Sequence, residues 1–224
     1  MSSTEIIKIG SVSLSLNKSL RAKHVFLKQD SKGEITLTYP KFYPKCWAVR
    51  FAKTQMPWIL AHLKHGQKET VFAPNDTIQI LGKSYLLTSG KRTLESQTEL
   101  TISGSPEFFH RRVCSYAQKQ LLPYIQQKVK SYATQLGVKP GRITLRDTSS
   151  RWGSCSSTHN LSFCWKIAFS PLDVIDYLIA HEVSHLSHMN HGPKFWATVD
   201  KLTNHRMQAE KWLKENGRKL QSIR

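Results

Sequence analysis

Acidic residues are scarce in this chain. Its 224 residues include 15 Asp and Glu against 33 Lys and Arg, which gives a formal net charge of +18. An excess of this size favours anionic partners such as nucleic acid, nucleotides or acidic proteins. The excess is spread over both halves of the chain, so a basic surface that only promotes solubility would explain it equally well. Nucleotides and nucleic acid are therefore candidate partners, and no recognised base-reading motif accompanies them.

Signals for export, membrane insertion and disulfide formation are missing. The N-terminal stretch MSSTEIIKIG lacks the basic start and continuous apolar core of a signal peptide. No apolar run approaches the roughly 18–20 residues that are needed to cross a bilayer. The four cysteines, Cys46, Cys114, Cys155 and Cys164, form no C-x-x-C pair and no disulfide framework. We expect a cytoplasmic protein with free thiols and no membrane partner.

The first half of the chain has the pattern of short strands around one interrupted helix. Alternation in KIGSVSLSL and short apolar segments in HVFLKQ and EITLTYP predict strands, and further strands are predicted between residues 69 and 103. A helical spacing from Trp47 to Leu63 is broken or kinked by Pro57. The sequence predicts an α+β protein with two parts: a β-rich region over residues 1–104 and a second domain over residues 105–224.

The second half is mostly helical, with two strands of its own. A long helix is expected from Ser105-Pro106 to Gly137, kinked at Pro123. Strands are predicted at ITLRD and at LSFCWKIAF, residues 161–169, where apolar and small or polar residues alternate. Ser170 is expected to cap the next helix, with Pro171 at its first position. Apolar residues occur on both sides of that helix, which predicts a central, buried element.

This buried helix carries the pattern H-E-x-x-H at residues 181–185. His181 and His185 are four residues apart, so their rings leave the same face and can share one ion. Glu182 lies about 100° around the helix, within reach of a water on that ion without being a ligand. The pattern predicts two zinc ligands and a general base. Histidines on a buried helix face are costly unless they are paired or bound to a metal.

Two histidines compete for the place of third ligand. His188 lies about 10 Å along the helix axis from His181, which is too far for three rings to surround one tetrahedral ion. His191 fits if the chain turns back after the helix, and Asn190 and Gly192-Pro193 favour that turn. We therefore predict His181, His185 and His191 as the metal ligands, and a supporting or solvent-facing position for His188.

The region from Arg151 to Trp196 resembles the YgjP-like metal-dependent hydrolase family, minimal zincins related to the SprT-like and WLM metalloproteases. The matching motifs are RWGSC at 151–155, HEVSH at 181–185, NH at 190–191 and FW at 195–196. The resemblance implies a zincin-like domain with a small antiparallel sheet packed on the H-E-x-x-H helix, zinc on the three histidines, and Glu182 as catalytic base. It also implies that the strand over residues 161–169 lies at an edge where an extended peptide adds. Two departures appear: Cys164 stands where asparagine is expected, and Gly192 where serine is usual.

The expected activity is hydrolysis by a zinc-bound water that Glu182 activates, most simply in a metallopeptidase acting on peptide or protein substrates. Arg151 and His159 are candidates for stabilising the transition state or contacting substrate. A nucleotide pyrophosphatase using the same chemistry is an alternative that suits the basic charge, although no G-x-x-x-x-G-K-[ST] loop is present. A third hypothesis is a nucleic-acid-associated module with structural zinc. The intact Glu182 argues against it, because a purely structural site needs no general base.

Overall fold

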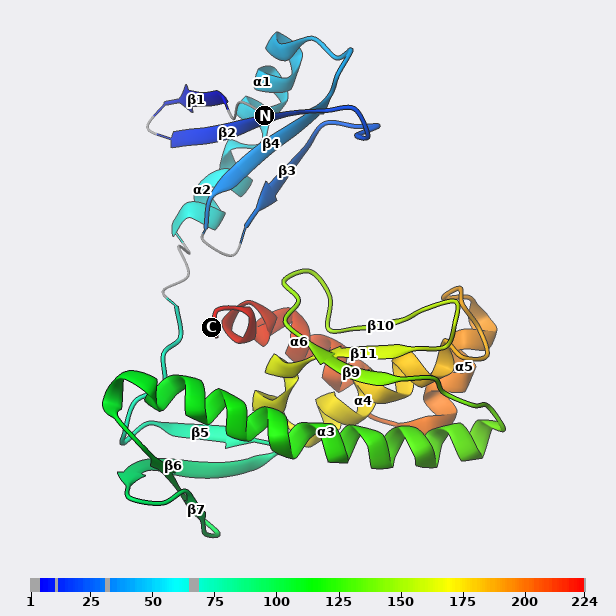
Figure 1. Ribbon diagram of the computed structural model, residues 1–224. Helices are drawn as coiled ribbons and strands as arrows, with labels where there is room; N and C mark the ends of the chain where they lie inside the picture. The colour runs from blue at the N-terminus through cyan, green and yellow to red at the C-terminus, as the bar shows by residue number, and fades with distance from the viewer. Residues whose placement is uncertain (1–4, 11, 31–32, 65–68, 224) are drawn as a thin grey trace. The chain divides into compact units, whose positions relative to one another are not determined.

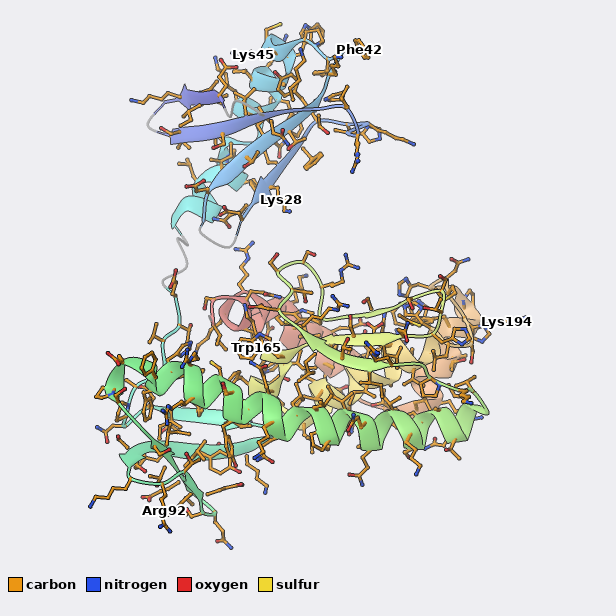
Figure 2. The ribbon with its side chains drawn as sticks, in the orientation of Figure 1. Lys28, Phe42, Lys45, Arg92, Trp165 and Lys194 are labelled. Carbon is orange, nitrogen blue, oxygen red and sulfur yellow. The ribbon has the colours of Figure 1, made fainter. Side chains whose placement is uncertain are left out.

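The chain folds as an α+β protein whose contacts divide it into two compact units, residues 1–68 and residues 69–224. The structure, a computed structural model, describes residues 5–10, 12–30, 33–64 and 69–223, without the side chains of 61–64. Among these residues, no helix is both long and apolar enough to cross a bilayer. Figure 2 shows basic side chains on both units, among them Lys28 and Lys45 on the first and Arg92 and Lys194 on the second.

The first unit packs two helices on a four-stranded mixed sheet (Figure 1). Its strands are β1 (Glu5–Ile9), β2 (Val12–Ser19), β3 (Phe26–Gln29) and β4 (Ile35–Pro40), in the order β1-β2-β4-β3. Val12, Leu14 and Leu16 alternate inward along β2, which confirms the predicted alternation. The helices α1 (Lys45–Thr54) and α2 (Met56–Lys64) are separated at Gln55, two residues before Pro57, close to the break that the proline predicts.

The second unit begins with another four-stranded sheet and the longest helix. The strands β5 (Thr77–Ile80), β6 (Lys83–Gly90), β7 (Leu94–Glu95) and β8 (Glu99–Ser103) have the order β5-β6-β8-β7. A 3-10 turn, η1 (Pro106–Phe108), leads into α3 (Phe109–Leu136), which contains Pro123. Gly137 ends α3 in the left-handed conformation, at φ 66°, where glycine has no Cβ penalty.

The elements that carry the predicted site follow α3. They are β9 (Ile143–Arg146), β10 (Gly153–Cys155), β11 (Leu161–Cys164), η2 (Trp165–Phe169), α4 (Leu172–Ser184), α5 (Pro193–Leu202) and α6 (Arg206–Gln221). The three strands form a sheet in the order β10-β11-β9, with β10 antiparallel and β9 parallel to β11. Helix α4 contacts β10, α3, α5 and α6, so it is the central helix that its sequence predicts (Figure 1). The sheet on the H-E-x-x-H helix is therefore mixed, and the expected antiparallel sheet is corrected on this point.

A single core joins β5–β8 to the helices of the second unit. Ile78, Leu87 and Leu100 are buried in the same apolar cluster as Val129 of α3 and Ile175 of α4. The predicted boundary at residue 104 therefore falls inside the second compact unit. Periodicity identified β5, β6 and β8 correctly, but the strand expected around residues 69–73 is only an isolated bridge between Thr70 and Ile223. Periodicity also does not reveal which helices the strands pack against.

The predicted strand over residues 161–169 is wrong in its second half and in its place in the sheet. Strand β11 ends at Cys164, and the 3-10 turn η2 follows with all five residues buried, so the alternation expected of a half-exposed strand is lost. Lys166, a polar residue in that alternation, is buried with its Nζ 3.1 Å from Oδ1 of Asp147. Strand β11 is also the central strand, and the edge next to α4 belongs to β10.

The start of α4 also differs from its prediction. The helix begins at Leu172 with Pro171 in the capping position, and no side chain caps it. Ser170 instead donates its hydroxyl to the carbonyl oxygen of Ile167 at 2.7 Å. The serine thus closes the preceding 3-10 turn, which fixes the direction in which the chain enters α4.

Candidate metal centre

The H-E-x-x-H segment occupies the last turn of α4. His181 and Glu182 lie inside the helix, and His185 is the residue directly after its last turn, still in a right-handed helical conformation. The rings of His181 and His185 are 5.1 Å apart between centroids. The helical spacing of four residues is therefore preserved up to His185, and both rings leave the same face of the helix.

The chain reverses after α4 and returns His191 to the first two histidines. The amide of Gly192 donates to the carbonyl oxygen of Asn190 at 2.8 Å, and α5 begins directly afterwards at Pro193. This turn places Nε2 of His191 3.1 Å from Nε2 of His181. One ring nitrogen from each of His181, His185 and His191 falls within a group no wider than 4.8 Å.

His188 supports this group through its backbone. Its carbonyl oxygen lies 3.1 Å from Nδ1 of His185. A carbonyl oxygen can only accept a hydrogen bond, so Nδ1 carries the proton and Nε2 of His185 offers its lone pair. The imidazole of His188 is outside the three-histidine group, which comprises only His181, His185 and His191 among the described residues.

The three histidines fit a divalent metal. Two nitrogens that bind one tetrahedral zinc ion at about 2.0–2.1 Å lie roughly 3.3 Å apart, close to the 3.1 Å between His181 and His191. Burial lowers the pKa of His181 to about 4 and also lowers the pKa of His185. Both imidazoles are therefore neutral near pH 7, the form that binds a metal. Three imidazoles are a donor set that suits zinc.

Glu182 lies beside this group and is 5% exposed. Burial raises the pKa of its carboxyl to about 8, and the positive charge of Arg151 partly opposes that rise. Its Oε2 atom is buried without a hydrogen-bond partner among the described residues. A buried carboxyl oxygen without a hydrogen-bond partner costs stability. Its lone pairs remain available to accept a proton or a hydrogen bond from a bound water.

Aromatic rings fix the histidines from the side of α5. Phe195 is fully buried, and its ring centroid lies 4.9, 4.6 and 4.7 Å from those of His181, His185 and His191. Trp196 stacks on His191 at 5.7 Å, and the guanidinium of Arg206 lies over the indole. The packing of Phe195 restricts the rotation of all three imidazoles.

A cavity of about 340 Å³ opens beside His181 and Glu182. It lies among β10, α4 and α6, and Arg151, Tyr177 and Glu210 are among its lining residues. The Tyr177 hydroxyl donates to Oε1 of Glu210 at 2.9 Å, and burial raises the pKa of that hydroxyl. Tyr177 precedes His181 by four residues, so helical spacing could have identified it. Nothing in the sequence indicates that Glu210 would reach the same cavity.

The remaining predicted residues separate in the structure. Arg151 is exposed at the cavity, whereas His159 lies in the turn between β10 and β11, at φ 61°, and does not line the cavity. None of the four cysteines forms a disulfide bond, as predicted. Cys155 and Cys164 both stay outside the three-histidine group, and the Cys164 thiol lies 3.5 Å from the carbonyl oxygen of Thr148.

Comparison with known proteins gives one match over most of the chain and two distant structural likenesses. No curated protein sequence matches the chain. Abylysin from Pyrococcus abyssi, solved as a metallopeptidase zymogen, is 16% identical with a TM-score of 0.37, over 41% of this chain and 93% of its own. Jannalysin from Methanocaldococcus jannaschii, also a metallopeptidase zymogen, is 21% identical with a TM-score of 0.35, over 41% of this chain and 92% of its own. TM-scores this low mark a distant likeness only.

The family match covers the three histidines, Glu182 and the cavity beside them. The model for the YgjP-like metallopeptidase domain matches residues 23–216. This range also includes most of the first unit, so both compact units contribute to it. A metal-dependent peptidase is the activity that this match supports, and the chain belongs to the YgjP-like family.

Proposed function

We propose that this protein is a zinc-dependent metallopeptidase in which His181, His185 and His191 hold the ion and Glu182 is the general base. The observation that carries the proposal is the position of the buried Glu182 carboxyl, with its free Oε2, beside a three-histidine group no wider than 4.8 Å. Three protein ligands leave one coordination position open, which distinguishes catalytic from structural zinc sites.

Glu182 holds and moves the proton in this proposal. A bound zinc ion supplies Lewis acidity, which polarises a peptide carbonyl and lowers the pKa of an attacking water. A cation close to Glu182 favours its ionised form, which offsets the rise in pKa that burial causes. The ionised Oε2 can then accept the proton of the water and pass it to the leaving amine.

Arg151 is the residue of this chain best placed to stabilise negative charge on the substrate. Its guanidinium is exposed at the cavity and acts electrostatically on Glu182, so it can donate to an oxyanion that forms nearby. His159 is outside the cavity lining and takes no part in the proposed mechanism.

The proposed substrate is an extended peptide that pairs with the free edge of β10. Among the residues that the structure describes, this strand pairs with β11 alone, and its first residue, Gly153, contacts the Glu182 carboxyl. A peptide added to this edge would receive main-chain hydrogen bonds, and alternate side chains would face the molecule. Side chains facing the cavity would meet Tyr177, Glu210 and Leu213.

Turnover assays on the full-length, zinc-loaded protein test the proposal. Unfolded protein and peptide mixtures should be cleaved, and nucleoside triphosphates should not. Glu182→Gln should keep its zinc and lose about 10²–10⁴-fold in turnover, the usual contribution of a general base. Glu215→Gln, the same change at an exposed position of α6, is the matched control. Unchanged turnover in zinc-loaded Glu182→Gln, or hydrolysis of nucleotides alone, would contradict the proposal.

A further inference from the structure

A large hollow of the second unit lies away from the three histidines. It has a volume of about 990 Å³ and is lined by β9, β10, β11 and the loops that join them. Thr144, Ser154 and Ser162 line it from the three strands, while the neighbouring Phe163 of β11 points into the core. The hollow therefore lies on the face of the sheet opposite the core, and we call it the sheet groove.

Hydroxyl groups form a row across this groove. Ser154 and Thr144 are the register partners of Ser162 on its two sides, so the three side chains stand next to one another. The hydroxyls of Ser154 and Ser162 are 2.8 Å apart and share a hydrogen bond. Each hydroxyl has one proton and two lone pairs, so the row keeps capacity to donate to a further acceptor.

Three arginines line the same groove. Arg142, Arg146 and Arg151 are all exposed, and none forms an ion pair with another residue that the structure describes. The carboxylate of Asp147 also lies in the lining, but it pairs with the buried Lys166 at 3.1 Å. Arg142 and Arg146 thus line the groove without an ion-pair partner among the described residues, while the charge of Arg151 also acts on Glu182. This positive charge raises the local concentration of anions.

The remaining lining indicates which anion fits. It consists of serine, threonine and asparagine side chains with Cys155 and Leu161, and no aromatic residue is present among the described lining residues. Base stacking needs aromatic side chains, and binding the apolar face of a peptide needs apolar walls. The lining of the groove therefore favours neither stacked bases nor an apolar peptide. Guanidinium forks and hydroxyl donors match phosphate oxygens, which are the repeating feature of a nucleic-acid backbone.

We propose that the sheet groove binds the phosphate backbone of a nucleic-acid strand without reading its sequence. Arg142 precedes β9 at one end of the sheet, and Arg146 ends β9 at the other end, where the loop that carries Arg151 leads into β10. The hydroxyl row crosses the sheet between these two ends. Arg151 also lines the cavity beside Glu182, so a bound strand would run up to the proposed peptidase site. The binding itself needs neither zinc nor turnover, and so it stands independently of the proposed function.

The test measures binding of labelled single-stranded and duplex DNA of equal length to the full-length protein at 50 and 200 mM salt. Arg142→Gln/Arg146→Gln removes two groove charges outside the catalytic cavity. Lys91→Gln/Arg92→Gln removes the same charge from the exposed turn after β6 and is the matched control. The groove variant should bind at least 10-fold more weakly. Its slope of log affinity against log salt should be shallower by about two, because two phosphate contacts are lost. The control should keep both.

A second readout places the strand without mutating the groove. Cys155 is partly exposed and lines the groove, so its alkylation by maleimide reports occupancy. Bound DNA should slow modification of Cys155 in the wild-type protein and leave it unchanged in the Arg142→Gln/Arg146→Gln variant. The proposal is overturned by the absence of DNA binding at 50 mM salt, by equal losses in the two double variants, or by stronger binding of an acidic peptide or a free nucleotide than of DNA.

Discussion

The carboxyl group of Glu182 packs directly against the backbone of Gly153, the first residue of β10. A Cβ atom at position 153 would overlap with Oε1, Cδ and Cγ of Glu182, so only glycine permits this approach. The contact joins the RWGSC segment to the H-E-x-x-H helix, two motifs that lie far apart in sequence. It explains why glycine stands at this position of a strand, where glycine is otherwise unfavourable.

Gly153→Ala should therefore impair turnover while leaving the metal in place. The added methyl group displaces the Glu182 carboxyl, and a displacement of about 1 Å in a catalytic group can cost on the order of 10²-fold in rate. The zinc content should stay at that of the wild type, because the three atoms nearest to the added methyl group all belong to Glu182 and none to a histidine. Gly192→Ala is the control, since no atom lies within 4 Å of a Cβ there. Equal activities in the two variants would show that the contact is dispensable.

Metal content should distinguish His191 from His188. His191→Ala removes a proposed ligand and should weaken zinc binding by more than about 100-fold, since even outer partners of ligands are worth roughly 10–100-fold. His188→Ala keeps the backbone carbonyl that accepts from His185 and should retain the wild-type zinc content. Elemental analysis and a competition titration with a chelator measure both. An empty His188→Ala protein beside a loaded His191→Ala protein would refute the ligand assignment.

Phe195 should contribute to stability and to metal affinity together. Its fully buried ring contacts all three histidine rings, so Phe195→Ala leaves a cavity and frees the imidazoles to rotate. We expect a loss of about 3–5 kcal/mol in the free energy of unfolding, against roughly 1 kcal/mol for Phe195→Leu. Urea unfolding of the metal-free protein measures this, and a zinc titration of each variant measures affinity. A purely structural residue would lower stability and leave the zinc affinity of the folded protein unchanged.

The carboxyl of Glu95 should make stability depend on pH in the acid range. It accepts hydrogen bonds from the hydroxyls of Tyr116 and Tyr85, and these lower its pKa below the ordinary value of 4.5 for a glutamate. A group whose pKa is lower in the folded state stabilises the protein above its unfolded pKa, and this contribution disappears as the pH falls through the folded pKa. The free energy of unfolding should thus fall less steeply below pH 4.5 in Glu95→Gln than in the wild type. Glu99→Gln on β8 is the matched control and should follow the wild-type curve.

Local geometry carried the prediction of the three histidines. An i, i+4 pair on a helix must leave one face, and this relation needs no knowledge of the rest of the fold. The return of His191 was predictable from Asn190 and Gly192-Pro193, because these residues end helices and permit turns. His188 was set aside on distance along the helix axis, and the structure leaves its imidazole outside the group.

The features that could not be predicted from the sequence depend on contacts between segments that are distant along the chain. The five residues after Cys164 alternate as a strand does, yet the core buries them all and η2 forms. The order β10-β11-β9, which leaves β10 at the edge, depends on contacts between strands and not on any periodicity within them. Tyr177 and Glu210 come together from α4 and α6, which only tertiary packing brings into contact.

The sequence by itself determined which residues form the proposed metal site, because the proposed ligands and base lie within eleven residues on one helix and one turn. The tertiary structure decided everything that depends on distant segments meeting: the approach of Gly153 to Glu182, the shared core of residues 72–223, and the arginine-lined sheet groove. The physical reason is that helical and strand periods fix which way a side chain faces. They do not fix which distant surface it will face, because that choice is made by the burial of the whole core.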